Sequence, residues 1–525
     1  MEPDAQTRLI EALHNPDRFP HPCTDFQLIE THISWVILCG PYAYKIKKAV
    51  NLGFLDFSTL ERRRHFCEEE LRLNRRLAPQ LYLQVVHFSG SPDAPQLGGP
   101  GKPVEYAVKM ARFSQQDLLA RMAREHRLQA LHIDHMIEQI AAFHKRIPAA
   151  AADSGYGTPE AVARPVEENF AQIRERTGNP EQLRVLEAVE QWSREEQQRR
   201  SAVFAERREH GFVRECHGDL HLGNMAWVGQ ELLIFDGIEF NPSLYWIDVM
   251  SEAAFLCMDL EDRGYAPFAY RFLNGYLEHT GDYAGLTVCR YYLAYRAMVR
   301  AKVAGIRMQQ EPAPERNREA DELRGYLDLA LSYVRPRRPL LLITHGLSAS
   351  GKSTLSAPLA ERLPAIRVRS DRERQRLYGS SDEDAAGVVE GGIYTPKATE
   401  QTYGRLLRLA EAILQAGFSV IVDAAFLKAE QRAPFRRLAA RLRTPFRIIH
   451  FDAPVEVLRR RIRQRQAAGG DISEADVQVL EHQIQTYQGL LAAETDVSLR
   501  IDTEAVTDAA AVQDLLNRHL RASSE

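Results

Sequence analysis

The chain has 525 residues, more than one hydrophobic core normally supports, so about two to four domains are expected. Hydrophobic residues make up 45% of the sequence and charged residues 26%, which are the proportions of a folded globular protein and exclude a disordered or fibrous chain. The formal net charge of −4 excludes a general nucleic-acid coat protein.

Six cysteines are scattered over the first part of the chain and form no C-x-x-C pair. This spacing argues against a disulfide framework or a zinc ribbon and favours a reducing compartment. The N-terminus lacks the basic and then apolar pattern of a signal peptide, and no apolar run reaches the roughly 18 residues that span a bilayer. These features predict a cytoplasmic protein without a membrane partner.

Two proline-containing breaks, at residues 309–315 and 335–339, flank a stretch with a helical pattern. The second break is the predicted domain boundary, which gives domains at residues 1–335 and 336–525. The first of these is net acidic and the second is net basic.

Residues 33–50 alternate apolar and polar side chains around Gly40-Pro41, which predicts a β-hairpin. Because side chains alternate along a strand, Lys45 and Lys47 lie on the same face of the second strand. Either lysine is in position to reach the phosphates of ATP, and the sequence leaves this choice open.

Ser58 and Glu61 predict a capping box at the start of a helix that runs to about Leu77. Within this helix Glu70 lies on an apolar stripe, so it is predicted to point inward and pair with a strand lysine. Taken alone, a lysine and a glutamate on adjacent elements are more typical of an ordinary surface ion pair, and it is the downstream loop that favours the inward pair. Residues 105–113 are predicted to form an edge strand that carries the adenine-binding hinge.

The most informative loop begins with His217-Gly218-Asp219, and Asn224 and Asp236 follow five and seventeen residues after Asp219. Asp219 is predicted to orient an acceptor hydroxyl and accept its proton, while the oxygens of Asn224 and Asp236 bind Mg²⁺. An Asx-type turn would account for the first three residues but not for the full spacing.

Two further residues near this loop are given structural roles. His221 is expected to pack or hydrogen bond within the loop. Asp248, in a helical stretch downstream, is expected to hold the loop through backbone amides.

The loop resembles that of the aminoglycoside phosphotransferase and choline kinase group, which shares the protein-kinase fold and has His-Gly-Asp in place of His-Arg-Asp. The resemblance covers about residues 25–330 and implies a bilobal α+β kinase domain that uses ATP and Mg²⁺. Asp236 is followed by Gly-Ile-Glu rather than Phe-Gly, and no protein-kinase glycine-rich loop is visible, so a small-molecule acceptor is expected. Residues 45–48 and 53–57 look like those of bacterial members fused to a P-loop domain.

Residues 340–345 form an apolar strand that leads into the sequence GLSASGKST at 346–354, and a helical pattern follows. This is the strand, loop and helix that a P-loop requires. Its backbone N–H groups face phosphate, Lys352 reaches the β- and γ-phosphates, and Ser353 is a ligand of Mg²⁺. The predicted nucleotide-binding residues are Gly346, Ser348, Ser350, Gly351, Lys352, Ser353 and Thr354.

Residues 365–371 and 419–423 predict two further strands, each ending in an aspartate, and residues 446–451 predict a fourth. Asp371 is predicted to hold the acceptor, and Asp423 to lie near Mg²⁺ in the manner of a Walker B carboxylate. A strand-terminal aspartate can also simply cap a helix.

A helix predicted over residues 455–466 is dense in arginine. Arg461 and Arg465 are four residues apart and share a face, so both guanidinium groups are in position to close over a transferring phosphoryl group. The alternative is a solvated face whose arginines favour helix formation. The region of about residues 339–520 resembles gluconate kinase and the kinase part of polynucleotide kinases, with residues 471–475 similar to their lid. This resemblance implies an α/β P-loop domain with a parallel sheet.

These features predict a bifunctional ATP-dependent phosphotransferase. The first domain would phosphorylate a small-molecule hydroxyl, and the second would act on another small molecule or a nucleic-acid end. One alternative is a single catalytic kinase domain regulated by a P-loop switch, and another is that the arginine-rich region binds RNA or DNA ends. Aminoglycosides are not the predicted acceptor, because no carboxylate cluster for a polycation can be placed and a fold family does not transfer a substrate.

Overall fold

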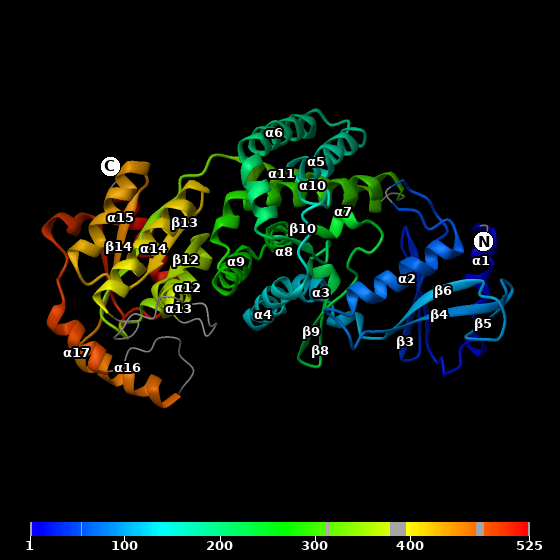
Figure 1. Ribbon diagram of the computed structural model, residues 1–525, viewed down its shortest axis with the longest axis horizontal. Coiled ribbons are helices and arrows are strands. Elements are labelled where there is room, and N and C mark those ends of the chain that lie inside the picture. Colours follow the sequence, from blue (N-terminus) through cyan, green and yellow to red (C-terminus); the bar gives the residue numbers. More distant parts are fainter. Residues whose placement is uncertain are drawn as a thin grey trace. The chain divides into compact units, whose positions relative to one another are not determined.

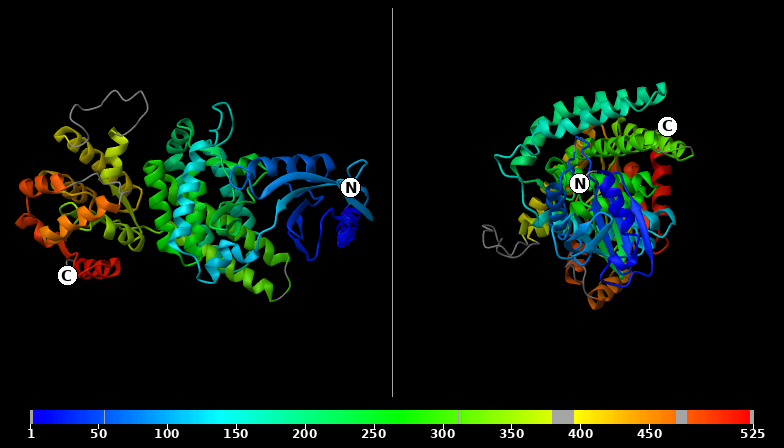
Figure 2. Two further views of the ribbon diagram at one scale, coloured as in Figure 1. Left: turned by 90° about the horizontal axis from the view of Figure 1, so that it is seen from below. Right: turned by 90° about the vertical axis from the view of Figure 1, so that its right-hand side faces the viewer.

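Residues 3–53, 55–310, 312, 314–378, 395–468 and 477–522 are described by the computed structural model of the protein (Figure 1, Figure 2). Contacts among residues divide the chain into two units. The first holds the residues up to Asp259 together with Tyr295–Leu327, and the second holds Leu260–Ala294 together with the residues from Asp328 onward. Within the described ranges, no helix combines the length and apolarity needed to cross a bilayer.

The first unit begins with a six-stranded antiparallel sheet in the order β1-β2-β3-β6-β4-β5. The predicted hairpin is confirmed, because β2 and β3 pair on either side of Gly40-Pro41. The prediction of an edge strand at residues 105–113 is wrong: β6 lies between β3 and β4, and Ala107 and Val108, on its opposite faces, are both fully buried. The strands are β1 (Phe26–Glu30), β2 (Ser34–Cys39), β3 (Tyr42–Lys47), β4 (Tyr82–Ser91), β5 (Ala94–Leu97) and β6 (Glu105–Ala111).

Helix α2 (Leu60–Asn74) packs on β6 and β4 (Figure 1). It begins after Thr59, whose Oγ1 accepts a hydrogen bond from Arg62 N at 3.2 Å. The capping box predicted from Ser58 and Glu61 is therefore wrong by one residue. The hydroxyl of Ser58 donates instead to a carboxylate two residues upstream.

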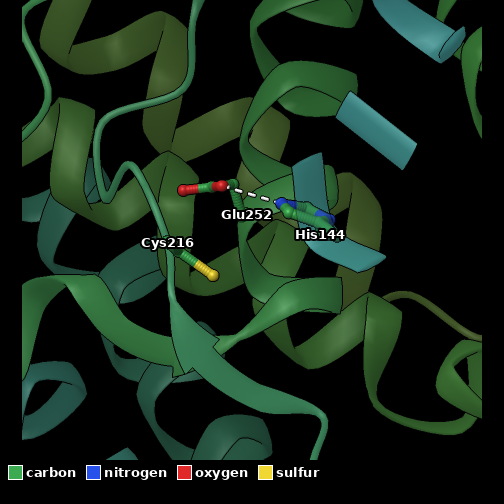
Figure 3. A group of neighbouring side chains, drawn as sticks. All are labelled: His144, Cys216 and Glu252. Atoms are coloured by element: carbon green, nitrogen blue, oxygen red, sulfur yellow. Dashed lines mark hydrogen bonds and ion pairs between the residues drawn. The ribbon is translucent and has the colours of Figure 1, made fainter. Parts of the chain in front are cut away.

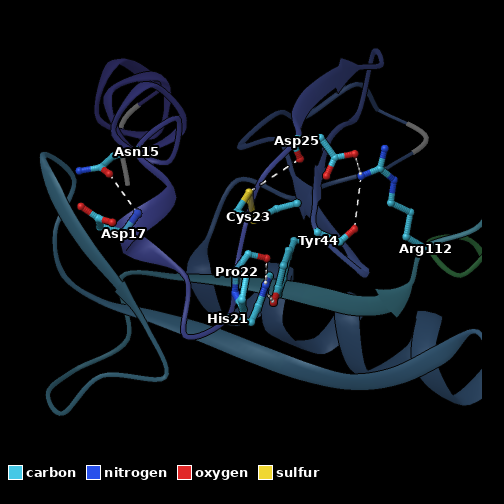
Figure 4. Close-up of a disulfide and its surroundings, with 10 residues drawn as sticks. Asn15, Asp17, His21, Pro22, Cys23, Asp25, Tyr44 and Arg112 are labelled. Atoms are coloured by element: carbon cyan, nitrogen blue, oxygen red, sulfur yellow. Dashed lines mark hydrogen bonds and ion pairs between the residues drawn. A yellow bond between two sulfur atoms is a disulfide. The ribbon is translucent and has the colours of Figure 1, made fainter.

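A disulfide joins Cys23 to Cys39 near the start of this sheet (Figure 4). Cys39 ends β2, and the chain segment that leads into β1 brings Cys23 beside it, with the two Cα atoms 5.0 Å apart. The cysteine spacing argued against a disulfide framework, and it did not indicate this single pair, because spacing carries no information about the pairing of β1 with β2.

Two short antiparallel strand pairs downstream place the loop around Asp219. β7 (Val213–Glu215) pairs with β10 (Trp246–Asp248), and β8 (Met225–Val228) pairs with β9 (Glu231–Ile234). The sheet followed by helices confirms the predicted α+β kinase-like architecture. The helices from the N-terminus to residue 334 are α1 (Pro3–Ala12), α2, α3 (Leu119–Arg124), α4 (Ala130–Arg146), α5 (Pro159–Arg174), α6 (Pro180–Glu209), α7 (Pro242–Tyr245), α8 (Val249–Asp262), α9 (Ala266–Thr280), α10 (Leu286–Gln310) and α11 (Glu315–Val334).

The second unit contains a five-stranded parallel sheet in the order β12-β13-β11-β14-β15, as predicted for a P-loop domain. Its strands β11 and β13 are near-continuous apolar runs, as expected for central strands of a parallel sheet that is covered on both faces. The predicted strand at 365–371 ends at Arg369, and β15 was not predicted. The strands are β11 (Leu341–His345), β12 (Ala365–Arg369), β13 (Ser419–Asp423), β14 (Phe446–Asp452) and β15 (Ser498–Asp502).

The helices of the P-loop part pack an apolar core on this sheet. Leu359 and Leu516, from α12 and α18, are fully buried against Ile421 and Ile449 of the sheet. The helices are α12 (Lys352–Arg362), α13 (Ser370–Tyr378), α14 (Pro396–Gln415), α15 (Ala429–Leu442), α16 (Val455–Ala468), α17 (Val477–Thr486) and α18 (Ala509–Ala522).

The division by contacts differs from the boundary predicted between residues 335 and 336. Residues Leu260–Ala294 lie in the same unit as the parallel sheet, because α9 packs on α12 and β12. A set of residues in contact is not by itself a domain that folds alone, so the boundary stays a prediction.

The corrected helix start gives a test. Thr59→Ala is expected to destabilise the first turn of α2 by about 1 kcal/mol, because it leaves backbone N–H groups without their cap. Ser58→Ala is the matched control and is expected to change the same turn by less than about 0.5 kcal/mol. Hydrogen exchange of the Arg62 amide measures both effects, and equal exchange rates in the two variants would contradict the assignment of the cap.

Candidate active sites

The β8–β9 hairpin brings together the three residues predicted for the first site. Asn224 comes just before β8 and Asp236 just after β9, so they lie at the same end of the hairpin. The Asn224 amide nitrogen donates to Asp219 Oδ2 at 2.8 Å and lies 3.5 Å from the Asp236 carbonyl oxygen. Asp236 has φ +61°, a left-handed conformation rare for aspartate, which turns its side chain at the end of the strand.

Asp219 is held as an ionised carboxylate. Burial by itself raises the pKa of Asp219, but the neighbouring His221, together with Arg300 and His217, outweighs it and holds this pKa well below its ordinary value. His221 Nε2 lies 3.3 Å from Asp219 Oδ2, and its Nδ1 accepts a bond from Gly223 N within the loop. An ionised Asp219 accepts a hydrogen bond from a hydroxyl group without needing to lose a proton first.

Glu252 of α8, rather than Asp248, holds the loop. Glu252 Oε1 accepts bonds from His217 N at 2.8 Å and Gly218 N at 2.7 Å, and its other oxygen lies 2.8 Å from His144 Nε2 (Figure 3). The prediction for Asp248 is wrong, because Asp248 ends β10 and receives both the Arg207 guanidinium and an amide of α8.

Glu252 belongs to a buried cluster that has the composition of a metal site. The ligand atoms of His144, Cys216 and Glu252 lie within 4.8 Å of one another (Figure 3). Both Glu252 oxygens already accept hydrogen bonds from His144 and the loop, so the cluster anchors the loop. Burial raises the pKa of Glu252, but the bond from His144 and its charge outweigh this and lower the pKa.

A buried charge network confirms the inward direction predicted for Glu70. Its two oxygens lie 2.9 Å from Lys45 Nζ and 2.7 Å from Lys47 Nζ, and Glu70 itself is fully buried. Lys45 also contacts Asp236, whereas Lys47 contacts Glu239. An ordinary surface ion pair is therefore excluded. Glu239 was not singled out from the sequence, although it stands only three residues after Asp236.

The oxygens at this site suit a magnesium ion. Asp236 and Asn224 offer carboxylate and amide oxygens, which hard divalent cations prefer. The Asp236 carboxylate already contacts one cation, the Lys45 ammonium. Asp236 is half exposed, so a phosphate-bound ion has access to it.

The P-loop connects β11 to α12 and curves as a phosphate-binding loop should. Gly346 and Gly351 have φ of +147° and +87°, and a Cβ on Gly346 would overlap the Phe451 carbonyl oxygen, so both glycines are needed. Lys352 Nζ donates to the carbonyl oxygens of Gly346 at 2.9 Å and Leu347 at 2.7 Å. The lysine thus lies across the mouth of the loop.

A cavity of about 1600 Å³ opens in front of the P-loop, which is ample room for a triphosphate and an acceptor. Most predicted residues of the second site line it, whereas Gly346 and Ser350 lie behind its wall. The lining residues that were predicted are Ser348, Gly351, Lys352, Ser353, Thr354, Asp371, Asp423 and Arg461.

Asp423 is a buried carboxylate at the end of β13. Ser356 Oγ donates to its Oδ2 at 2.9 Å, and Arg367 Nη1 lies 3.8 Å from the same oxygen. With Ser353 exposed on the same cavity wall, this set of hydroxyl and carboxylate oxygens fits Mg²⁺. Asp371 lies in the first turn of α13, where Arg374 reaches it at 3.4 Å.

Arg461 closes one side of the cavity. Its guanidinium lies 3.3 Å from the Ala349 carbonyl oxygen of the P-loop and 3.0 Å from Thr503 Oγ1. Thr503 follows β15, so its part in the site could not be found without that strand. The side chain of Arg465 and residues 471–475 lie outside the described residues.

The Glu70 network predicts an acid sensitivity. Burial by itself raises the pKa of Glu70, but the charges of Lys45 and Lys47 outweigh it and lower this pKa from 4.5 to about 2. Between these two pKa values the unfolded chain binds more protons than the folded chain does. The contribution of Glu70 to the stability of the folded state is therefore complete above a pH of about 4.5 and is lost as pH falls toward about 2.

Thermal unfolding measured at several pH values is expected to show this loss in the wild type. Glu70→Gln should lower Tm near neutral pH and make the fall of Tm at acid pH, the acid limb, less steep, because the glutamine side chain cannot titrate. Glu69→Gln is the control, since Glu69 faces Arg72 on the outside of the same helix. An acid limb in Glu70→Gln as steep as in the wild type would contradict the assignment.

Two family models match the chain. The model described as "Phosphotransferase enzyme family" matches residues 55–289, and the model described as "AAA domain" matches residues 341–490. Among curated proteins, the adenylyl-sulfate kinase of Myxococcus xanthus is 34% identical over 113 residues, which are 22% of this chain and 57% of that enzyme.

Two of the similar solved structures each align with about a third of this chain. A gluconokinase from Sinorhizobium meliloti aligns with 36% of this chain and 95% of its own, at 20% identity and a TM-score of 0.27. The APS kinase of Mycobacterium tuberculosis aligns with 35% of this chain and 99% of its own, at 24% identity and a TM-score of 0.26.

Relatives from two mycobacteria match almost the whole chain. Uncharacterized proteins of Mycobacterium tuberculosis (strain H37Rv) and Mycobacterium bovis are each 34% identical over 487 residues, covering 92% of this chain and 94% of the relative. The chain therefore belongs to the family of these proteins, and in this chain an aminoglycoside phosphotransferase-like kinase domain is followed by a P-loop kinase domain.

Proposed function

We propose that the protein is a bifunctional, cytoplasmic, ATP-dependent phosphotransferase with one catalytic site in each part. The observation that carries this proposal is that two separate groups of residues each combine a phosphate-binding lysine with oxygen ligands for Mg²⁺. One group surrounds Asp219 and the other surrounds the P-loop.

At the first site, Asn224 and Asp236 would hold Mg²⁺, which would supply positive charge to neutralise the phosphates of ATP. Asp219 accepts a hydrogen bond from the acceptor hydroxyl and orients it toward the γ-phosphate. Glu252 fixes this loop through its amides. The remaining chemistry is positioning, which is most of what phosphoryl transfer requires of a protein.

The contacts of the two strand lysines favour Lys45 as the phosphate ligand. Lys45 contacts Asp236, which is half exposed, whereas Lys47 is 1% exposed and enclosed between Glu70 and Glu239. Lys45 therefore needs only to exchange Asp236 for a phosphate oxygen. Lys47 keeps Glu70 in place.

At the second site, Lys352 and the loop amides would bind the β- and γ-phosphates, and Ser353 and Asp423 would hold Mg²⁺. Arg461 contacts the P-loop at Ala349 and lines the cavity, where its guanidinium would neutralise charge on the transferring group. Asp371 opens onto the same cavity and is the residue proposed to orient the acceptor hydroxyl.

The acceptors proposed for both sites are small molecules with a free hydroxyl group. For the P-loop site, the match to an adenylyl-sulfate kinase supports a small acceptor over a nucleic-acid end. A regulatory P-loop switch remains the second candidate, because the contacts at Asp371 are fewer than those around the phosphate side of the site.

Separate substitutions test whether there are two activities. Asp219→Ala is expected to lower kcat at the first site by about 10²–10⁴-fold, because the acceptor hydroxyl loses its orienting base. Lys352→Ala should abolish turnover at the P-loop site and spare the first. Asp153→Ala and Lys397→Ala change exposed residues of the same types and serve as controls.

The measurement is transfer from labelled ATP to a panel of small hydroxylated acids, sugars, nucleosides and 5′-hydroxyl oligonucleotides, with the full-length variants. If neither substitution lowers any transfer, the two-site proposal is wrong. If Asp219→Ala protein binds ATP but phosphorylates nothing, the P-loop part is the switch.

The two strand lysines should separate in kinetics and stability. Lys45→Met is expected to lower kcat/KM for ATP at the first site by at least about tenfold, because it removes a phosphate contact. It should lower Tm less than Lys47→Met does, because Glu70 keeps Lys47 as a partner and Asp236 is half exposed. Lys47→Met should lower Tm more, because it leaves Glu70 and Glu239 facing each other in the interior, where a lost partner costs about 3–5 kcal/mol. The reverse pattern would assign phosphate binding to Lys47.

A further inference from the structure

Helix α9 covers the outer edge of the parallel sheet in the P-loop part. β12 is an edge strand, and α9 packs on it and on α12 (Figure 1). Asn274 of α9 donates from Nδ2 to the Ala365 carbonyl oxygen at 2.9 Å and accepts from Arg367 N at 2.7 Å. Its amide therefore pairs with main-chain groups that another strand would otherwise use.

One turn further along α9, Glu278 contacts three arginines, two of which lie in β12 and one at the start of α13. Its carboxylate lies 3.4 Å from Arg367 Nη2, 2.9 Å from Arg369 Nη1 and 2.9 Å from Arg372 Nε. The Glu278 and Arg367 side chains are only 14% and 12% exposed, so their charges are screened little by water.

Arg367 connects this cluster to the metal side of the P-loop site. Its Nη1 lies 3.2 Å from the Ser353 carbonyl oxygen, 3.5 Å from Ser356 Oγ and 3.8 Å from Asp423 Oδ2. Among the described residues, Glu278 and Asp423 are the carboxylates that Arg367 contacts. The guanidinium is thus shared between a carboxylate outside the site and the carboxylate proposed to hold Mg²⁺.

We propose that Glu278 is a positioning residue of the P-loop site, restraining Arg367 so that Asp423 stays available to Mg²⁺; this rests on the function proposed for that site. Without Glu278, the Arg367 guanidinium turns to Asp423 and forms a closer ion pair. That pair competes with the metal for the same oxygen. Glu278 lies in the segment matched by the phosphotransferase family model, so a residue counted with the first part of the chain sets the metal affinity of the second.

The test measures ADP binding by calorimetry in full-length protein, with Mg²⁺ and with EDTA. All variants are made in Asp236→Ala protein, which is called the background protein. This substitution removes the carboxylate proposed to hold Mg²⁺ at the first site, so the remaining Mg²⁺-dependent gain in ADP affinity comes from the P-loop site. Glu278→Gln is expected to reduce that gain by about tenfold, while metal-free ADP binds within about twofold of the background protein.

A second substitution distinguishes positioning from a general structural role. Glu278→Gln combined with Arg367→Gln should recover the Mg²⁺-dependent gain, because the competing cation is gone, and Glu278→Asp should retain most of it. Arg271→Gln is the matched control: it breaks an ion pair between α9 and Glu361 of α12 at 3.0 Å without involving Arg367. It is expected to leave the gain unchanged.

Three outcomes would overturn the proposal. The proposal is wrong if Glu278→Gln has the same Mg²⁺-dependent gain in ADP affinity as the background protein. It is also wrong if the double variant, with a Tm equal to that of the background, does not recover this gain. If Glu278→Gln does not fold, the proposal is wrong if Glu278→Asp has a normal Tm but has lost the Mg²⁺-dependent gain in ADP affinity. A background protein with no Mg²⁺-dependent gain, or one whose ADP binding survives Lys352→Ala, overturns the function proposed for the P-loop, which is a different result.

Discussion

The buried carboxylate of Glu70 is the point on which the geometry of the first site depends. It accepts two ammonium groups from alternate residues of one strand, and each lysine reaches a different acidic residue after β9. Helix α2, strand β3 and the segment that carries Asp236 are thereby fixed together. A charge taken out of water must be paired, so the cost of leaving any member alone keeps the whole set in one arrangement.

The same principle shapes the loop around Asp219. The His217 and Gly218 amides donate to Glu252, whose second oxygen meets His144, and the Leu222 amide donates to Asp259. The loop conformation is therefore set by two buried acids of α8. The two proposed nucleotide sites are built differently. The first would bind phosphate through side-chain charges from distant elements, and the second through the backbone of a single glycine-bounded turn.

Short-range patterns were sufficient to predict much of this structure. The β2–β3 hairpin, the P-loop between β11 and α12, and the inward direction of Glu70 all follow from local periodicity and composition. Predictions failed where the answer depended on packing between distant segments. The position of β6 inside its sheet, the choice of Glu252 over Asp248, the Cys23–Cys39 pair and the contribution of Thr503 after β15 are of this kind. A buried acid within the apolar run of α8 was a usable signal for Glu252.

The cover that Asn274 gives to β12 has a consequence for how such a two-part gene can change. If the chain were split at the proline-rich break, the downstream product would expose an uncapped strand, and unpaired peptide groups at a sheet margin invite association with other chains. A chain that began after α9 would therefore present β12 to other proteins, whereas one that began before α9 would keep Asn274 over this edge.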